Sequence, residues 1–449
     1  MSNPAAVFKA YDIRGVFPDE LDARLTRELG GAFAVLVLEA EPETTQVVVG
    51  RDMRPSGPVL AKAFSDGIRA QGLDVMDIGL ASTDLVYFAS GHLNLPAAVL
   101  TASHNPTRYN GIKLCLAGAR PVGQDTGLGR MAELVEAGLP IGVGDGKSEA
   151  ADLLDAFANH VRSFVDPGAL RPLKVVADTA NGMGGLVLPT VFDTLPFELE
   201  ILYVELDGDF PNHPPDPIRP ENMRDLQDRV LSLGADIGLA FDGDADRVFL
   251  VDEQGATVSG SLTTALIASA ILRDDPGATI IHNLICSRSV TEVITERGGR
   301  AVRSRVGHSF IKEAMASEGA AFGGEHSGHY YFRDNFCADS GIIAALIVLE
   351  ALSTHDGPLS GLVAPFDRYA ASGEINFTVE DPENLIEIIA GRYGDHHQDR
   401  LDGLTVEAED WWFNLRASNT EPMLRLNLEA SDPLTCVERI AEVRGVIGQ

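Results

Sequence analysis

Cysteine is scarce in this sequence, and none of the four cysteines lies in a CxxC pair or at a zinc-ligand spacing: Cys115, Cys286, Cys337 and Cys436. A disulfide framework or a zinc ribbon is therefore not expected, and free thiols suit a reducing compartment. Long hydrophobic runs are also missing, and the longest, at 341–352, predicts a buried helix because it is too short to cross a membrane. The first residues lack a basic region followed by an apolar core, so no signal peptide is expected. These absences favour a cytoplasmic protein.

Positive charge is in short supply as well. The chain has 66 acidic and 35 basic side chains, a formal net charge of -31, and only six of the basic residues are lysines. Such a chain is not expected to bind nucleic acid or an anionic membrane as its main partner. The hydrophobic share of 45% is ordinary for a globular protein and excludes a disordered acidic tail.

Short β-branched or apolar runs alternate with helical segments along the chain, which predicts an α/β architecture with mixed sheets. The Gly-rich polar stretch at 140–152 is typical of a domain boundary, and a small last unit begins near residue 370. The Pro-rich stretch at 210–220 excludes regular helix and central strand there. We therefore expect several α/β units followed by a smaller one.

The segment DGDADR places Asp242, Asp244 and Asp246 at alternate positions directly after an apolar strand. Three carboxylates at one turn repel each other unless a cation lies among them, and oxygen ligands favour Mg²⁺ over Zn²⁺. A calcium EF-hand loop is disfavoured because Arg247 stands where that loop needs glycine and strands flank it. A solvated acidic turn and an aspartyl-phosphate loop are the remaining alternatives.

The segment TASHNP at 101–106 begins where another predicted strand ends, so Ser103 is expected in a polar loop that opens toward a cleft. A serine there can act as a nucleophile or carry a phosphate, but no GxSxG elbow supports acyl transfer. Lys113 follows ten residues later, and a lysine whose pKa is lowered by burial or by neighbouring charge can act as an acid or base. The alternatives are an ordinary turn and an ordinary surface lysine.

In GGEHSGHYYF, at 323–332, Glu325, Ser327 and His329 alternate and share one face of an extended backbone. A carboxylate and a hydroxyl on one face suit hydrogen bonding to vicinal sugar hydroxyls. Zinc bound by His326 and His329 is a weaker alternative, since the helical HExxH spacing is absent.

The turn RASNTEP at 416–422 presents one guanidinium, two hydroxyls, an amide and backbone N–H groups. This combination predicts a phosphate cradle, with an ordinary polar turn as the alternative.

Together these motifs, in this order, resemble the α-D-phosphohexomutase superfamily, and most closely its bacterial phosphomannomutase/phosphoglucomutase branch. The segments FKAYDIRG at 8–15 and VGRDMRPSG at 49–57 match the same family, so the resemblance covers nearly the whole chain. It implies three related α/β domains with mixed sheets and a smaller C-terminal α+β domain around a central cleft. The expected domains are 1–145 with the phosphoserine loop, 146–250 with the metal loop, 251–366 with the sugar-binding loop and 367–449 with the phosphate-binding turn.

The resemblance implies an enzyme, an intramolecular phosphotransferase that interconverts hexose 1-phosphate and hexose 6-phosphate of mannose and/or glucose. The phosphate would be carried on Ser103, and a hexose 1,6-bisphosphate would serve as intermediate and activator. Mg²⁺ would be held by an oxygen of phosphorylated Ser103 with Asp242, Asp244 and Asp246. Small-molecule sugar phosphates would be the partners of a monomer or dimer.

The resemblance also implies roles for individual side chains. The catalytic set is Ser103, Lys113, Arg247, His329 and Arg14, with Lys113 and His329 as the candidates for proton transfer. The substrate-binding set is Tyr11, His308, Glu325, Ser327, Arg416, Ser418, Asn419 and Thr420. Within it, Glu325 and Ser327 would bind sugar hydroxyls, and the last four residues would hold the phosphate that is not reacting.

Three positions depart from the patterns of some relatives. Ile285 stands where some members of the branch carry a lysine, and Arg288 is a candidate replacement. Thr101 and Ala245 differ from phosphoglucosamine mutases, which favours mannose or glucose as the sugar. Phosphoglucosamine mutase, a phosphatase and a non-catalytic sugar-phosphate-binding protein of the same fold remain the alternatives.

Overall fold

The computed structural model describes residues 4–142, 144–417 and 423–448. The chain divides into two compact units. Unit 1 consists of Met1–Ser259 and Ser327–Leu362, and unit 2 of Gly260–His326 and Val363–Gln449. The predicted third domain, 251–366, therefore contributes residues to both units.

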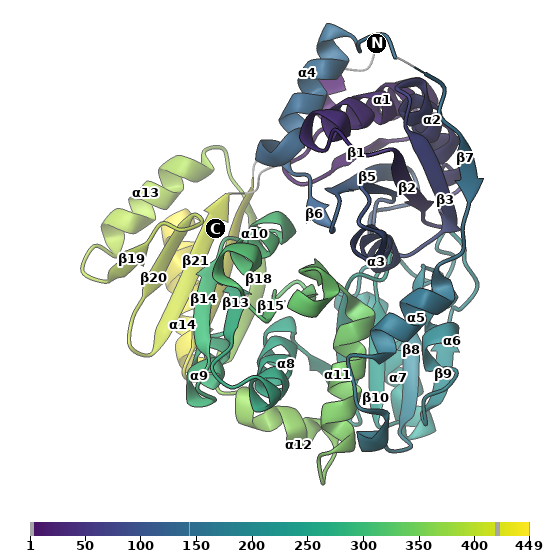
Figure 1. Ribbon diagram of the computed structural model, residues 1–449. Coiled ribbons are helices and arrows are strands. Elements are labelled where there is room, and N and C mark those ends of the chain that lie inside the picture. Colours follow the sequence, from purple (N-terminus) through teal and green to yellow (C-terminus); the bar gives the residue numbers. More distant parts are fainter. Residues whose placement is uncertain (1–3, 143, 418–422, 449) are drawn as a thin grey trace. The chain divides into compact units, whose positions relative to one another are not determined.

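Unit 1 begins with a seven-stranded mixed sheet in the order β1-β5-β4-β2-β3-β7, with β6 paired to β5. Its strands are β1 (Ile13–Val16), β2 (Gln46–Arg51), β3 (Asp74–Leu80), β4 (Ala97–Leu100), β5 (Tyr109–Leu116), β6 (Arg120–Pro121) and β7 (Ser148–Ala150). Its helices are α1 (Ala23–Ala40), α2 (Gly57–Ala70), α3 (Thr83–Leu93) and α4 (Gly129–Ala137). In Figure 1, α1 and α2 lie on one side of this sheet and α3 on the other. The strands β2, β3 and β4 are parallel, so the loop after β4 opens at their carboxyl edge.

A second mixed sheet of unit 1 has the order β12-β11-β10-β8-β9. Its strands are β8 (Lys174–Asp178), β9 (Glu198–Leu202), β10 (Ile237–Phe241), β11 (Val248–Asp252) and β12 (Thr257–Val258), with helices α5 (Leu154–Arg162), α6 (Gly184–Phe192) and α7 (Arg224–Leu233). Residues 210–219 form neither helix nor strand, as the prolines predict. Unit 1 ends with the hairpin β16 (Tyr330–Phe332) and β17 (Ala338–Asp339), then α11 (Gly341–Ser353) and α12 (Leu359–Val363).

Unit 2 contains three parallel strands, β13 (Thr279–Asn283), β14 (Arg300–Ser304) and β15 (Phe322–Gly324), with β13 in the middle. Their helices are α8 (Gly260–Asp274), α9 (Arg288–Glu296) and α10 (His308–Glu318). An antiparallel sheet in the order β18-β22-β21-β20-β19 follows. Its elements are β18 (Ala370–Thr378), α13 (Pro382–Arg392), β19 (His397–Asp399), β20 (Leu404–Glu407), β21 (Trp411–Ala417), β22 (Met423–Ala430) and α14 (Pro433–Ile447).

The apolar run at 341–352 forms α11, most of whose residues are buried, so the prediction of a buried helix is confirmed. In the part of the chain that the structure describes, no helix combines the length and apolar character needed to span a membrane.

Candidate active site

Ser103 lies in the loop that follows β4, where its backbone takes a left-handed conformation with φ of 49°. Its N–H donates to Thr101 Oγ1 at 2.9 Å, and its hydroxyl donates to Asp242 Oδ2 at 2.6 Å. The side chain is buried. A non-glycine residue with positive φ costs free energy, so the surrounding structure must hold this loop in place.

Arg54 holds the serine loop. Its terminal N–H groups donate to four backbone carbonyls of the loop: those of Ser103 (2.8 Å), Asn105 (2.7 Å), Pro106 (2.9 Å) and Tyr109 (3.1 Å). Its Nε pairs with Asp52 Oδ2 at 3.1 Å, and neither side chain has any exposed area. The segment VGRDMRPSG matched the family, but its sequence did not indicate that Arg54 shapes the loop around Ser103. Only the folded arrangement brings these distant residues together.

The turn between β10 and β11 brings three buried aspartates together, as the spacing predicts. Each of Asp242, Asp244 and Asp246 offers a carboxylate oxygen, and these oxygens all lie within 4.8 Å of one another. Glycine is needed at position 243 because a Cβ there would lie 2.4 Å from the carbonyl oxygen of Ser103. Ala245 has φ of 62°, a conformation that glycine adopts at lower cost. The predicted cluster is therefore formed, and it lies against the serine loop.

Lys113 lies among these carboxylates, with Nζ 2.7 Å from Asp244 Oδ2 and 2.5 Å from Asp246 Oδ2. Burial alone would lower the pKa of Lys113, but the negative charges of Asp244 and Asp246 raise it well above its usual range. Lys113 is therefore not an ordinary surface lysine, and its pKa is not lowered. In this arrangement Lys113 is a charged ion-pair partner.

Arg247 compensates the third carboxylate, with Nη2 2.9 Å from Asp242 Oδ2. Burial nevertheless raises the pKa of Asp242 to about 7, with Arg247 acting against the shift and Asp244 and Asp246 adding to it. For Asp244, burial raises the pKa, but the charge and hydrogen bond of Lys113, the hydrogen bond of Thr83 and the charge of Arg247 together outweigh it, and the net shift is downward. The three carboxylates thus share two ion-pair partners, Lys113 and Arg247.

The aspartate cluster fits a divalent cation on two grounds. Among the described residues, Asp244 Oδ1 and Asp246 Oδ1 are buried oxygens without a hydrogen-bond partner. A buried carboxylate oxygen without a partner is costly, and a hard cation with oxygen ligands removes that cost. The excess of carboxylates over ion-pair partners in the cluster favours the same ion. The three aspartates can therefore hold Mg²⁺.

Replacing Lys113 with methionine is expected to lower the free energy of unfolding by about 3–5 kcal/mol, because it leaves two buried carboxylates without their cation. Added Mg²⁺ should raise the melting temperature of Lys113→Met more than that of the wild type, because the variant cluster carries more negative charge. Thermal unfolding with and without Mg²⁺ measures both effects. Lys62→Met is the control, since Lys62 is 75% exposed and has only an i,i+4 pair with Asp66. Equal Mg²⁺ responses of Lys113→Met and wild type would contradict this account.

Further predicted residues of unit 1 lie at the same centre. Arg14, in β1, donates from Nη1 to Asn105 Oδ1 of the serine loop at 2.5 Å. Arg247 Nη2 lies 3.5 Å from Ser103 Oγ. His329 forms an isolated antiparallel bridge with Arg247, and its Nδ1 lies 3.8 Å from Asp246 Oδ1. Tyr11 and Ser327 are half-buried residues of the same unit.

The remaining predicted residues belong to unit 2. Glu325 is 2% exposed, and its Oε2 accepts from Asn283 Nδ2 at 3.1 Å and from the N–H of Gly307 at 3.3 Å. His308, directly after Gly307, begins α10 and is half-buried. The guanidinium of Arg416 lies beside Glu374, and the distance from Arg416 Nη2 to Glu374 Oε2 is 3.4 Å. Ser418, Asn419 and Thr420 lie outside the described residues.

The structure adds two positioning residues that the sequence analysis did not identify. Thr83, at the start of α3, donates from Oγ1 to Asp244 Oδ2 at 2.6 Å and from its N–H to the Asp244 carbonyl at 3.1 Å. Asn283, at the end of β13, fixes the carboxylate of Glu325. Both lie at the ends of regular elements, as a site-forming residue of an α/β fold does, but no local motif distinguishes them.

Ile285 and Arg288, at positions where the sequence departs from some relatives, have different environments in the structure. Ile285 is a buried side chain with 8% exposure. The guanidinium of Arg288 donates to the backbone carbonyls of Ala408, Glu409 and Trp411, at 2.6, 3.1 and 3.3 Å. Arg288 therefore ties α9 to the C-terminal sheet of unit 2.

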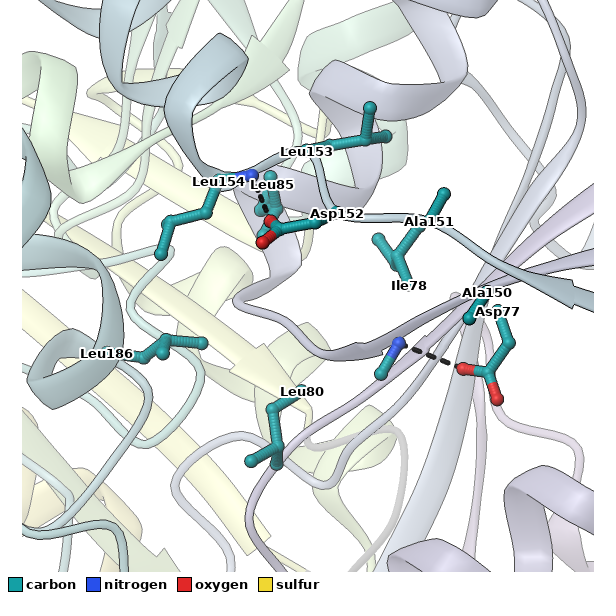
Figure 2. Close-up of a pocket in the computed structure, with 11 residues that line it drawn as sticks. Asp77, Ile78, Leu80, Leu85, Ala150, Ala151, Asp152, Leu153, Leu154 and Leu186 are labelled. Carbon is teal, nitrogen blue, oxygen red and sulfur yellow. Dashed lines mark hydrogen bonds between the residues drawn. The ribbon is translucent and has the colours of Figure 1, made fainter.

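Figure 2 shows a separate pocket of unit 1, with a volume of about 360 Å³. Its lining is mainly aliphatic and includes Leu80, Leu85 and Leu186. Its two carboxylates, Asp77 and Asp152, accept hydrogen bonds from the nearby N–H groups of Gly79 and Leu154. The lining includes no lysine, arginine or histidine, so it does not offer a sugar phosphate cationic partners.

Comparisons with known proteins identify the family of the chain. Models of the phosphoglucomutase/phosphomannomutase family match four successive segments: alpha/beta/alpha domain I at residues 5–133, domain II at 152–255, domain III at 259–369 and the C-terminal domain at 374–443. The chain is 41% identical to the phosphohexose mutases of Xanthomonas campestris pv. campestris, with 100% of both chains covered. It is 40% identical to the phosphomannomutase of Escherichia coli K12, with 96% of both chains covered.

A crystal structure of a phosphoglucomutase/phosphomannomutase family protein from Burkholderia thailandensis has the same fold. It superposes with a TM-score of 0.90 at 33% identity, over 100% of this chain and 98% of that chain. The fold is that of an α-D-phosphohexomutase. The chain belongs to the phosphoglucomutase/phosphomannomutase family. The predicted resemblance and the predicted fold class, three related α/β domains and a C-terminal domain, are thereby confirmed.

Proposed function

We propose that this protein is a phosphohexomutase that interconverts the 1- and 6-phosphates of mannose and/or glucose, with Ser103 as the phosphate carrier. One observation carries the proposal. Ser103 Oγ lies 2.6 Å from Asp242, in a buried cluster with two further aspartates, Lys113 and Arg247. A serine beside a cation-binding carboxylate cluster suits phosphoryl transfer, whose transition state needs positioning and charge neutralisation.

The chain's own residues account for each transfer. The bond between phosphorus and Ser103 Oγ breaks as a sugar hydroxyl oxygen bonds to phosphorus. The proton of that hydroxyl passes to His329, and the released serine oxygen takes a proton from Lys113, the other candidate for proton transfer. Arg14 and Arg247 neutralise the phosphoryl charge. Asp242, Asp244 and Asp246 would hold Mg²⁺, which would supply further neutralisation of the phosphoryl charge.

The second transfer runs in the opposite direction. The hexose 1,6-bisphosphate formed in the first transfer turns over and returns its other phosphate to Ser103, so an added bisphosphate acts as activator. Glu325 and Ser327 bind the sugar hydroxyls, and Tyr11 and His308 contact the substrate. The phosphate that is not reacting is bound by Arg416, Ser418, Asn419 and Thr420.

We also propose four domains, with the boundaries predicted from the sequence: 1–145, 146–250, 251–366 and 367–449. The proposal also places the protein in the cytoplasm, as a monomer or dimer that acts on small-molecule sugar phosphates and binds neither nucleic acid nor membranes. Size-exclusion chromatography with light scattering tests the oligomeric state.

A substrate panel tests the function. Mannose, glucose and glucosamine 1-phosphates are supplied in turn with Mg²⁺ and hexose 1,6-bisphosphate, and the 6-phosphates and inorganic phosphate are measured. Turnover of the mannose or glucose ester, well above that of the glucosamine ester, is expected. Preferred turnover of glucosamine 1-phosphate would indicate a phosphoglucosamine mutase. Release of inorganic phosphate at rates similar to those of isomerisation would indicate a phosphatase. Binding without turnover of any ester would indicate a non-catalytic sugar-phosphate-binding protein.

A further inference from the structure

Asp339 pairs with the ring of His329 inside unit 1. His329 Nδ1 lies 3.0 Å from Asp339 Oδ2, and Asp339 is 2% exposed. Asp339 ends β17, opposite Tyr331 in β16, so the strand pairing places it beside His329. Asp339 has no role in any motif that the sequence indicated.

This contact determines where the ring of His329 carries its proton. An ionised carboxylate can only accept a hydrogen bond, so Nδ1 must be the donor. The neutral imidazole then keeps its lone pair on Nε2, where it can take a proton.

The backbone around Asp339 is fixed from several sides. The N–H of Ser340 donates to the Tyr330 carbonyl at 3.0 Å. Ser340 Oγ donates to Asp84 Oδ2 at 2.7 Å and accepts from the N–H of Ile343 at 3.1 Å, where it caps α11. The carboxylate of Asp339 is therefore presented to His329 from an anchored strand end, as a positioning group requires.

We propose that Asp339 is a positioning residue that holds His329 in the Nδ1–H tautomer, with Nε2 as the acceptor for the proton of the reacting sugar hydroxyl. The proposal rests on the proposed function, in which His329 takes that proton as the sugar oxygen bonds to phosphorus. In the reverse transfer the same proton returns from Nε2 to the sugar oxygen. Asp339 itself neither contacts the substrate nor changes its protonation.

Steady-state kinetics with glucose 1-phosphate or mannose 1-phosphate provide the first test. Asp339→Asn is expected to lower kcat by about 100-fold, the scale of lost proton transfer, and to change KM by less than about twofold. Asp339→Glu, which restores a carboxylate, should recover part of kcat. Asp334→Asn is the control on the same hairpin, because Asp334 is 72% exposed and pairs only with the neighbouring Arg333 among the contacts described.

A double variant separates positioning from a general structural effect. If Asp339 acts through His329, adding Asp339→Asn to His329→Gln should lower kcat no further than His329→Gln alone. A further drop comparable to that of the single Asp339→Asn variant would overturn the proposal.

The ¹⁵N spectrum of histidine-labelled protein reads the tautomer directly. The His329 signals, identified by their loss in His329→Gln, should show Nδ1–H in the wild type and move toward Nε2–H in Asp339→Asn. An Nε2–H tautomer in the wild type would overturn the proposal even if Asp339→Asn failed to fold. This spectrum does not depend on turnover. An inactive wild type with the expected tautomer would therefore refute the proposed function but not the contact by which Asp339 sets the tautomer. An Asp339→Asn variant with wild-type kcat would refute the positioning role but not the proposed function.

Discussion

Ser103→Ala is expected to lower the mutase rate by about 10³-fold or more, because without the serine oxygen the phosphoryl group has no carrier between its two transfers. The hydroxyl donates to Asp242 within the aspartate cluster, so its loss removes the phosphoryl acceptor and leaves the three aspartates in place. The rate is measured with glucose 1-phosphate, Mg²⁺ and hexose 1,6-bisphosphate. Intact-mass measurement should show one phosphoryl group on the wild type after incubation with the bisphosphate, and none on Ser103→Ala.

Ser232→Ala is the matched control for this experiment. Ser232 is an exposed serine of the same unit that donates to the Arg229 carbonyl at 3.1 Å. We expect wild-type rates and wild-type phosphorylation from this variant. A Ser103→Ala protein that still isomerises at the wild-type rate, or that still gains a phosphoryl group, would refute the assignment of the carrier.

The chemistry of the aspartate loop was predictable from sequence because its geometry is local. Carboxylates at alternate positions directly after an apolar strand must converge at the following turn. The structure brings Asp242, Asp244 and Asp246 together as expected. Ser103 was predictable for the same reason, since its loop follows a strand whose carboxyl end opens at the edge of a mainly parallel region.

The electrostatic state of the site was not predictable, because it depends on contacts between distant parts of the chain. Lys113 lies 131 residues before Asp244 in the sequence, and nothing local to either residue indicates the pair. Burial and neighbouring carboxylates shift the pKa of a lysine in opposite directions, and only the folded distances determine which effect is larger. For Lys113 the carboxylates prevail, and the net shift of its pKa is upward.

Positioning contacts are still less visible in the sequence. Asn283 and Asp339 act on Glu325 and His329 through single side-chain hydrogen bonds, and each lies at the end of a strand. A residue of this kind leaves no spacing pattern, because its partner belongs to another segment. The family resemblance therefore indicated the candidate reactive groups, and the structure shows the side chains that contact them.

Arg54→Met is expected to lower the free energy of unfolding by about 3–5 kcal/mol, because it leaves the buried Asp52 without its partner. Asp52 and Arg54 have no exposed side-chain area. Burial already raises the pKa of the Asp52 carboxyl, with Arg54 acting against the shift, so the unpaired acid would be driven toward its protonated form. Denaturant unfolding measures the loss. Arg24→Met, at a 79% exposed arginine with an i,i+4 partner, should change stability by less than about 0.5 kcal/mol.

The same substitution should also impair phosphorylation of Ser103. Four carbonyls of the serine loop lose their donor, and the left-handed conformation of Ser103 is then no longer held. Arg54→Lys keeps the charge but lacks the planar set of donors, so it should recover more stability than phosphorylation. Adding Asp52→Asn to Arg54→Met removes the unpaired buried carboxylate. The double variant should therefore regain part of its stability, but not the native conformation of the serine loop. If the double variant regained both stability and wild-type phosphorylation, the loop would not depend on Arg54, and Ser103 would be held by its own contacts alone.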